Sequence, residues 1–383
     1  MTAIPAKPVV LHAVSRFLPR SETFVYTVVA GHRGFAAEVL CHGVEFADEF
    51  PFPRVHVESI PETKRSPGWW SAAFTEFVTG RSPWRRRVES LLERIRPSVI
   101  HAHFGPVGCQ MAAVARALGI PLVTSLYGVD AAVLPYTSRW RDQYVRLFRD
   151  GDLFLAEGPE MRKLVIAAGA PVERTVLQPI AIDLRKYPTW RPDATITVLF
   201  VGRFIEKKGL LDAIAAFASA HSRLPGARLT IVGNGPDESA ARALVAERGL
   251  IGVVEFVGTK PHADVIARLA RARVLIHPSA TAADGDSEGG APTILLEAQA
   301  IGTPIVSTRH ADIPYIAAEG PGVYLSDEHD IDALARDVVA AVESGNRTTA
   351  AHLTTRHDVS SAIASLESHY RTAIGRATRA VAV

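Results

Sequence analysis

The sequence predicts an α/β protein built from two domains, each with a parallel β-sheet. Short apolar runs alternate with longer helical patterns along all 383 residues, and this alternation is typical of βαβ units. A chain of this length forms about two domains. The polar, proline-bearing stretch 183–193 separates two α/β series of similar length. We therefore expect a first domain over residues 1–185, a second over 194–355, and a final helix over 356–383 that packs back on the first domain.

Composition and charge narrow the classes of function. Hydrophobic residues make up 48% of the chain and charged residues 21%, as in ordinary soluble globular proteins. The net charge of +2 gives no electrostatic basis for nucleic-acid binding. The two cysteines, Cys41 and Cys109, are too few for a metal cluster or a disulfide framework, which suits a reducing cytoplasm.

Contact with a membrane is expected to be peripheral. The N-terminal residues lack the pattern of a signal peptide, and no apolar run reaches the roughly 18 residues that a spanning helix needs. Residues 68–96 predict two helices that combine aromatic and basic side chains, as on an inner-membrane surface or beside a lipid phosphate: Trp69, Trp70, Trp84, Arg85, Arg86 and Arg87. We favour the alternative that the tryptophans pack on the sheet and the arginines face water, because one such cluster binds a bilayer weakly.

In the first domain, several elements follow directly from the pattern. A helix is expected with Ser21 as its N-cap and Glu22 in its first turn. Short strands are predicted at 8–13, 36–41, 54–57, 152–156 and 175–178.

Two further strands of this domain end in polar residues. One carries His101 and His103, which share a face because they are two residues apart. The next ends in Tyr127, Gly128 and Asp130. Ligands of open α/β sheets bind at the carboxyl ends of strands, so His103, Tyr127 and Asp130 are candidate site residues. Zinc at the two histidines is disfavoured, because no third metal-type ligand stands nearby in the sequence.

The second domain opens with a strand, a short loop and a helix over residues 196–217. Arg203 and Lys208 bracket the strand-to-helix turn, where two cations beside a helix N-terminus can hold a diphosphate. Gly209 allows a close backbone approach. Further strands are predicted at 227–236, 253–259, 273–278 and 305–308, and further helices at 332–342 and 360–377.

A glycine-rich loop of the second domain lies between a strand and a helix that Pro292 is well placed to begin. The N–H groups of Gly289, Gly290 and Ala291 are expected to face the loop, where with the helix dipole they favour an anionic or hydroxyl-rich ligand. Glu288 and Glu297 are the fixed acids of this stretch. A carboxylate at Glu297, about a turn and a half into the helix, can accept two hydroxyl protons, as from a ribose diol.

Together these motifs resemble the retaining glycosyltransferases of family 4, which have the GT-B fold. The second domain carries the motifs in the family's order: Gly202-Arg203 with Lys208-Gly209, Ile231-Val-Gly-Asn-Gly-Pro236, His277-Pro-Ser279, and Glu288-Gly289 with Leu295-Leu-Glu297. Three pieces of the first domain resemble the branch that builds bacterial exopolysaccharides such as colanic acid: Ser21-Glu-Thr-Phe24, His101-Ala-His-Phe-Gly105 and Tyr127-Gly-Val-Asp130. The resemblance covers essentially the whole chain.

The resemblance implies two Rossmann-like domains facing a central cleft, and transfer of a sugar from a nucleotide diphosphate-sugar, foremost a UDP- or GDP-sugar, to a glycan or lipid-linked acceptor. Arg203 and Lys208 would neutralise the diphosphate and Glu297 would hold the ribose. Glu288, with the N–H groups of the two glycines after it, would hold the donor sugar. The acceptor would lie on the first domain, with His103, Tyr127 and Asp130 lining the reaction centre. No resident cofactor or metal is implied.

The chain departs from the family pattern at three places. Eight residues, 289–296, separate Glu288 from Glu297 where the family usually has seven. Tyr127 stands where many relatives carry histidine, and tyrosine can donate a hydrogen bond but is a poor acid–base group near neutral pH. The glycine-rich first loop of many relatives is replaced by Phe17-Leu-Pro-Arg-Ser21.

Three alternatives remain at the level of sequence. Asp284 and Asp286 have the Asp-x-Asp spacing of a metal-diphosphate site, although two acids in a polar loop are more often solvated. The chain could be a non-catalytic nucleotide-sugar-binding partner in an assembly. It could also be a GT-B epimerase or phosphorylase, but a phosphorylase needs a second phosphate site or a cofactor lysine, for which the sequence shows no motif.

Overall fold

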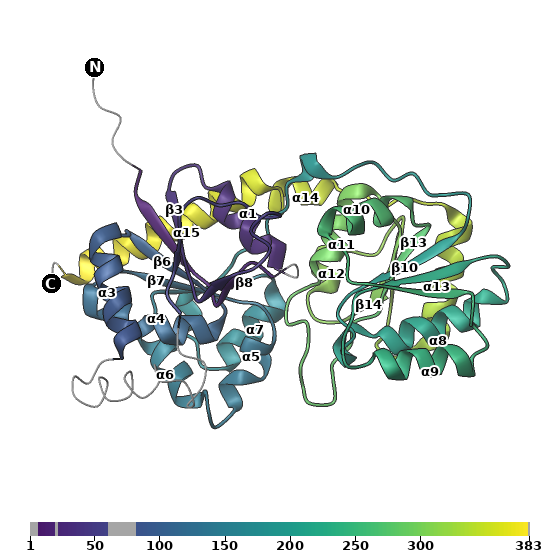
Figure 1. Cartoon of the computed structure of the whole chain (residues 1–383), viewed down its shortest axis with the longest axis horizontal. Coiled ribbons are helices and arrows are strands. Elements are labelled where there is room, and N and C mark those ends of the chain that lie inside the picture. The colour runs from purple at the N-terminus through teal and green to yellow at the C-terminus, as the bar shows by residue number, and fades with distance from the viewer. Residues whose placement is uncertain (1–6, 20–21, 60–81, 382–383) are drawn as a thin grey trace, which may run out of the picture.

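The computed structural model describes residues 7–19, 22–59 and 82–381, and they form two α/β domains that lie side by side (Figure 1). The first domain contains a seven-stranded sheet in the order β5-β3-β1-β6-β7-β8-β9, with every pairing parallel. Its strands are β1 (Val9–Ala13), β3 (Ala36–Cys41), β5 (Val55–Val57), β6 (Val99–His103), β7 (Leu122–Leu126), β8 (Leu153–Ala156) and β9 (Thr175–Leu177). A two-stranded parallel ribbon adds β2 (Arg16–Phe17) and β4 (Gly43–Val44).

Helices cover both faces of the first sheet, so the central strands have water on neither side. All five residues of β7 are buried, so its apolar side chains do not alternate with solvent-facing polar ones, and the hydroxyl residues Thr124 and Ser125 are buried with them. One face packs against α3 (Pro83–Ile95), α4 (Gly105–Leu118), α6 (Arg141–Asp150) and α7 (Pro159–Ala167). The other face packs against α1 (Thr23–Gly31) and the C-terminal helix α15 (Val359–Val381).

The second domain repeats this architecture with a six-stranded parallel sheet in the order β12-β11-β10-β13-β14-β15. Its strands are β10 (Thr197–Val201), β11 (Arg228–Val232), β12 (Val254–Gly258), β13 (Val274–His277), β14 (Ile305–Thr308) and β15 (Val323–Ser326). One face carries α8 (Leu210–His221), α9 (Glu238–Glu247) and α13 (Ile331–Ser344). The other carries α10 (His262–Arg271), α11 (Thr293–Ile301), α12 (Ile313–Ile316) and α14 (Ala351–Arg356).

Local chemistry fixes where the helices begin and end. The Ser82 side chain accepts a hydrogen bond from the Arg85 N–H group and so caps α3, and Asp330 caps α13 in the same way. The helix expected to begin at Pro292 begins one residue later, with Pro292 as the N-cap of α11. The predicted N-cap Ser21 and the first of the two helices expected over 68–96 lie outside the described residues.

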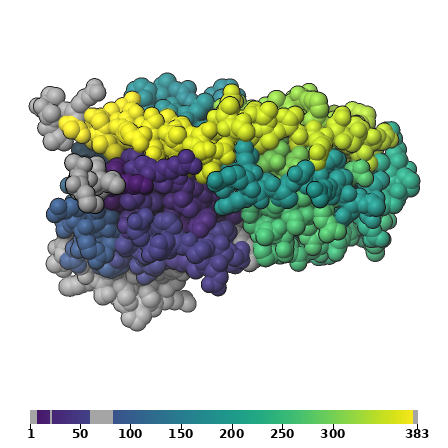
Figure 2. All heavy atoms as spheres, turned by 90° about the horizontal axis from the view of Figure 1, so that it is seen from above, coloured from purple at the N-terminus to yellow at the C-terminus, as the bar shows by residue number. Residues whose placement is uncertain are grey.

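The segment between the domains and the last two helices ties the two halves together. Trp190, in the stretch expected as a linker, is buried in the second domain, and its indole N–H donates to the Ala272 carbonyl oxygen at 2.7 Å. The C-terminal segment then runs back along both domains from α14 into α15 (Figures 1 and 2). Ile363, Leu366 and Tyr370 of α15 are buried against the first sheet.

The carboxyl ends of the two sheets approach each other closely through the start of α7. The Asp312 carboxylate, from the second domain, accepts the backbone N–H groups of Glu160 at 2.8 Å and Met161 at 3.0 Å. These are orphan donors of a helix N-terminus, which a carboxylate satisfies best. A side chain at Gly158 would lie 2.4 Å from Asp312, so glycine is needed there. Among the described residues, no helix is long and apolar enough to cross a membrane.

The packing of α15 predicts a large effect of one truncation on that helix. Leu366→Ala removes a side chain that is 1% exposed, and we expect it to lower the free energy of unfolding by about 2–5 kcal/mol. Ser368→Ala, on the exposed side of the same helix, should change it by about 0.5 kcal/mol or less. Chemical denaturation of both variants tests this, and equal effects would contradict the packing of α15 on the first domain.

Candidate active site

A cavity of about 410 Å³ lies between the domains, where the strands of both sheets end. This volume falls in the roughly 300–1,000 Å³ range of small-molecule sites. The first domain contributes Phe24, Tyr127 and Glu157 to the wall. The second contributes cations, acids and the N-terminal end of α11: Arg203, Lys207, Lys208, Lys260, His262, His277, Glu288, Thr293 and Glu297. The cavity therefore lies at the carboxyl edges of both sheets, where α/β folds bind ligands.

The turn from β10 to α8 brings its cations to the cavity wall. It forms a short 3₁₀ helix, η5 (Glu206–Lys208), and Gly209 ends it with a φ of +67°. A Cβ atom at Gly209 would lie 1.9 Å from the Pro278 carbonyl oxygen, so only glycine lets this turn pack against the end of β13. Arg203 is exposed at the cavity, whereas Lys208 is largely enclosed.

Glu288 and Lys208 form a buried ion pair. The Lys208 ammonium group lies 2.7 Å from one carboxylate oxygen of Glu288, and the Ser279 hydroxyl donates to the other at 2.9 Å. Burial alone would raise the pKa of Glu288, but Lys208, His277 and Lys207 outweigh it and lower that pKa to about 2. Glu288 is therefore a carboxylate at neutral pH. Lys208, predicted to bind the diphosphate, and Glu288, predicted to bind the donor sugar, thus form one ion pair.

The two glycines of the loop serve a different purpose from the expected one. The N–H group of Gly289 donates to the Ser287 hydroxyl at 3.0 Å, and that of Gly290 to the Glu288 carbonyl oxygen at 2.8 Å, so neither faces the cavity. A Cβ atom at Gly290 would lie 2.0 Å from the Glu157 carboxylate. The glycines let the first domain approach the loop. The prediction that the N–H groups of residues 289 and 290 face a ligand is therefore wrong.

Glu157 occupies the position where the loop N–H groups were expected to hold a ligand. Its side chain lines the cavity, and its carboxylate accepts the backbone N–H group of Ala291. Burial, with the nearby acids Asp312, Asp130 and Glu288, raises the pKa of Glu157 well above its ordinary value. No local pattern indicates Glu157, because only the approach of the domains brings it to the loop.

Glu297 lies at the cavity wall in the first turns of α11, with two partners. His262, at the start of α10, lies 2.7 Å from its carboxylate, and the Tyr187 hydroxyl donates to it at 3.3 Å. Burial would lower the pKa of His262, but the adjacent Glu297 raises it. The pair fixes the Glu297 carboxylate in place, and neither partner was foreseen in the sequence.

Asp286 of the Asp-x-Asp pattern is held by a lysine. The Lys207 ammonium group lies 2.9 Å from the Asp286 carboxylate and donates to the Ser287 carbonyl oxygen at 2.9 Å. Asp284 accepts the N–H group of Asp286. These contacts pin the glycine-rich loop to the cationic turn.

Of the first-domain candidates, only Tyr127 reaches the cavity. His103 is fully buried behind it and hydrogen-bonds to the Tyr127 hydroxyl at 2.8 Å. Asp130 is 1% exposed and accepts the backbone N–H groups of Gly105, Tyr127 and Gly128, each at 2.9 Å. The prediction that His103 and Asp130 line the reaction centre is therefore wrong. Both side chains instead position the loop that carries Tyr127.

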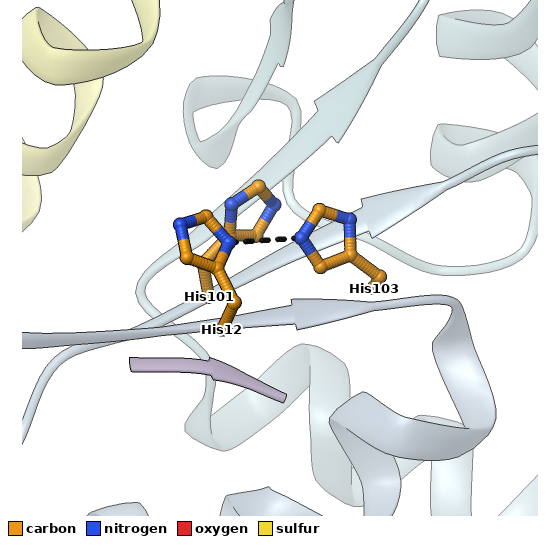
Figure 3. Close-up of side chains that lie close together, drawn as sticks. All are labelled: His12, His101 and His103. Carbon is orange, nitrogen blue, oxygen red and sulfur yellow. Dashed lines mark hydrogen bonds between the residues drawn. The ribbon is translucent and has the colours of Figure 1, made fainter. Parts of the chain in front are cut away.

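His101 and His103 share a face of β6, as predicted, and their rings stack at 4.2 Å. The sequence-based statement that no third metal-type ligand stands nearby is corrected by the sheet register, because β1 places His12 directly beside His101. His12 hydrogen-bonds to His103 and to His32 of the segment after α1. Figure 3 shows the three strand histidines together on one face of the sheet.

The aromatic and basic cluster is described only from residue 82 onward. Trp84 packs on the first-domain core, Arg85 pairs with Glu89, and Arg87 pairs with Glu58. Trp69 and Trp70 lie outside the described residues. Trp84 thus packs against the protein, as in the alternative that we favoured from the sequence. Contact of this cluster with a membrane stays a prediction.

Comparison with solved structures identifies the fold. The Anabaena protein Alr3699/HepE, solved in complex with UDP and glucose, superposes with a TM-score of 0.75 at 19% identity, over 94% of this chain and 98% of that chain. A sucrose-phosphate synthase from Thermosynechococcus elongatus gives 0.70 at 17% identity over 97% and 100%. The fold is therefore the predicted GT-B fold of glycosyltransferases, with two Rossmann-like domains around a cavity.

The sequence comparisons then give the family. Residues 11–186 match the model "Glycosyltransferase Family 4" and residues 188–357 match "Glycosyl transferases group 1". WcaL of Salmonella typhimurium LT2, a candidate glycosyltransferase of colanic acid biosynthesis, is 32% identical over 73% of this chain and 70% of its own length. WcaL of Escherichia coli K12 is 36% identical over 64% of this chain, and the match spans 61% of the relative. The chain belongs to the family 4 glycosyltransferases.

The Lys208–Glu288 pair predicts that loss of one partner destabilises the protein strongly and that loss of both partners destabilises it much less. Lys208→Met leaves a buried carboxylate without its cation, and we expect a loss of about 3–5 kcal/mol in the free energy of unfolding. The double variant Lys208→Met/Glu288→Leu removes both charges and should recover most of that loss, since an apolar pair carries no desolvation penalty. Urea denaturation of the single and double variants measures both. Additive losses would contradict a direct pair.

Proposed function

We propose that this protein is a retaining glycosyltransferase that moves a sugar from a nucleotide diphosphate-sugar, foremost a UDP-sugar, to a glycan or lipid-linked acceptor in exopolysaccharide biosynthesis. One observation carries the proposal: cations of the β10–α8 turn and the two acids Glu288 and Glu297 line a single cavity between the domains. The HepE structure with UDP and glucose supports the donor class. The WcaL relatives support the exopolysaccharide context.

The charges of the cavity match the needs of this reaction. Cleavage of the bond to the diphosphate develops negative charge on the leaving group, which Arg203 and Lys208 stabilise more in the transition state than in the ground state. Glu297, held by His262 and Tyr187, offers its carboxylate to a ribose diol. Glu288 offers its carboxylate to the hydroxyls of the transferred sugar.

Tyr127 and the first-domain wall face the donor site from the opposite side. The Tyr127 ring lines the cavity and packs between Phe24 and Phe104, with centroids at 4.9 and 4.7 Å. We place the acceptor on this side. In the proposed front-face displacement, the acceptor oxygen bonds to the anomeric carbon as the bond to the diphosphate breaks. The leaving phosphate oxygen takes the acceptor's proton, and inversion of the anomeric centre in the product would exclude this route.

The donor site predicts a nucleotide-specific gain in stability. Thermal unfolding with UDP, GDP, ADP and TDP, each with and without EDTA, should give an upward shift with one nucleotide that survives EDTA. A nucleotide at about 100 times its dissociation constant should raise the free energy of unfolding by about 2.7 kcal/mol. Arg203→Ala should lower turnover by about 10²–10³-fold, the loss typical of one preorganised charge at a transition state.

Arg242→Ala is the matched control, because Arg242 is exposed on α9 and pairs with Glu238 outside the cavity. Its turnover should equal that of the unchanged protein. If Arg203→Ala retained full activity of a reconstituted polysaccharide system, the chain would be a non-catalytic assembly partner. If no nucleotide shifted the midpoint, the donor site would be wrong.

The acid Glu22 predicts a pH dependence of donor binding. Burial raises the pKa of Glu22 to about 7, although Arg203 opposes the shift. The carboxyl group is therefore neutral below pH 7 and negatively charged above it, at the wall of a site for a diphosphate. The dissociation constant for UDP-glucose, whose own charge is constant in this range, should rise on the order of fivefold from pH 6 to pH 8. Calorimetry with Glu22→Gln should give a smaller rise, because His262, whose pKa is raised by Glu297, still loses its charge over part of this range. An equal rise in that variant would assign the effect elsewhere.

A further inference from the structure

A chain of hydrogen-bonded side chains runs from the cavity through the first sheet to the C-terminal helix. The Tyr127 hydroxyl lies 2.8 Å from Nδ1 of His103, and Nε2 of His103 lies 3.0 Å from Nδ1 of His12. Nε2 of His12 lies 3.0 Å from Nε2 of His32, whose Nδ1 lies 3.4 Å from the Glu367 carboxylate. The chain thus uses both nitrogens of all three rings. Figure 3 shows the link between His12 and His103.

The Glu367 end of the chain can only accept hydrogen bonds. Its carboxylate accepts the backbone N–H groups of Arg33 at 2.9 Å and Gly34 at 2.7 Å in addition to the histidine. Burial would raise the pKa of Glu367, but these donors and His32 lower it. Glu367 is therefore ionised at neutral pH, and Nδ1 of His32 must carry the proton that it shares with the carboxylate.

The tautomer of each histidine ring then determines the tautomer of the next ring in the chain. Burial lowers the pKa of His12, His32 and His103, the last to about 3, so each ring is neutral and has one N–H group and one acceptor nitrogen. With the proton of His32 on Nδ1, its Nε2 accepts from Nε2 of His12. Nδ1 of His12 then accepts from Nε2 of His103, and Nδ1 of His103 accepts the proton of the Tyr127 hydroxyl. Every donor in this direction finds one acceptor.

A metal site at the same histidines fits the geometry less well. His12, His101 and His103 each have a ring nitrogen within 4.8 Å of the others. A metal ion lies in the plane of each imidazole that binds it at about 2.1 Å, but the rings of His101 and His103 stack face to face at 4.2 Å and 30°. Both nitrogens of His101 are also hydrogen-bonded, to the Tyr370 hydroxyl at 2.6 Å and the Ser125 hydroxyl at 2.8 Å. The hydrogen-bonded chain accounts for the cluster.

We propose that Glu367 of α15 fixes the proton positions along this chain, so that the Tyr127 hydroxyl points its proton away from the cavity and its oxygen accepts a hydrogen bond from a substrate hydroxyl. The inference reverses the donor role expected of Tyr127 from sequence. It makes Glu367 and the three histidines positioning residues for the cavity. The identity of the substrate hydroxyl, on the sugar or its acceptor, rests on the proposed function, whereas the direction of the chain does not.

The direction of the chain is measured directly by the ¹⁵N chemical shifts of the histidine rings in the full-length protein labelled at histidine. Signals are assigned with His32→Phe and His103→Phe variants. We expect the Nδ1–H tautomer at His32 and the Nε2–H tautomer at His12 and His103. A charged imidazolium or an Nδ1–H tautomer at His103 would overturn the proposal. This result is independent of whether the protein transfers a sugar.

Variants at the far end of the chain test its effect on the cavity. Glu367→Leu removes the acceptor and should mix the tautomers at His103, and it should lower kcat/KM by about fivefold, the worth of one hydrogen bond. UDP affinity should stay unchanged. Glu367→Gln keeps a carbonyl acceptor and should restore both readouts. Arg371→Ala is the matched control, since Arg371 contacts the other oxygen of Glu367 at 3.3 Å, outside the chain.

The outcomes separate the two proposals. An unchanged tautomer at His103 in Glu367→Leu, or an equal loss in Arg371→Ala, would refute control by Glu367. If Glu367→Leu fails to fold, because Arg33 and Gly34 lose their acceptor, the tautomers of the unchanged protein still decide the direction of the chain. If those tautomers are as expected but no nucleotide binds, the proposed proton direction along the hydrogen-bonded side chains is supported and the proposed function is refuted.

Discussion

The cavity depends on one contact between the domains, the carboxylate of Asp312 on the N-terminus of α7. A helix N-terminus needs acceptors for its first N–H groups, and here the second domain supplies one carboxylate for two of them. Asp312 is 1% exposed, so water does not compete for these bonds. The same approach brings Glu157 over the glycine-rich loop, and the absence of side chains at Gly158 and Gly290 leaves room for it. The two sheet edges thus enclose a cavity between them.

At the cavity and in the glycine-rich loop beside it, acids and bases compensate each other in pairs. Glu288 pairs with Lys208, Asp286 with Lys207, and Glu297 with His262. Charges enclosed between two domains are costly unless they are paired. A ligand that carries its own anionic and hydroxyl groups can exchange partners with these pairs. The pairs therefore hold these side chains in place at the cavity.

The C-terminal helix combines a structural and a chemical role. It follows α14 from the second domain and buries Leu366 and Tyr370 against the first sheet. On the same helix, Glu367 ends the histidine chain that begins at Tyr127. A polar chain inside a sheet is tolerable only when every donor has an acceptor. The direction of its protons is consequently a property of the whole chain of contacts and not of any single residue.

Much of this architecture was decided by local pattern. Apolar runs bounded by turn residues predicted every strand of the two sheets except β15, because most side chains of a strand covered on both faces are apolar. Gly209 and the glycines of the loop were recognised because few other residues fit such turns. Glu288, Glu297, Arg203, Lys208 and Tyr127 do line the cavity, since motifs at the ends of parallel strands must meet at one edge.

Other features followed only from the tertiary structure. His12 joins His101 through strand register, His32 and Glu367 join them through α1 and α15, and Glu157 and Asp312 act across the domain interface. These partners lie as far as 335 residues apart in the chain, and no local spacing records such contacts. The sequence by itself determined which elements form and which edge of each sheet binds. The tertiary structure decided which side chains reach the cavity and which way their protons point, because burial and hydrogen-bond partners exist only once the domains have packed.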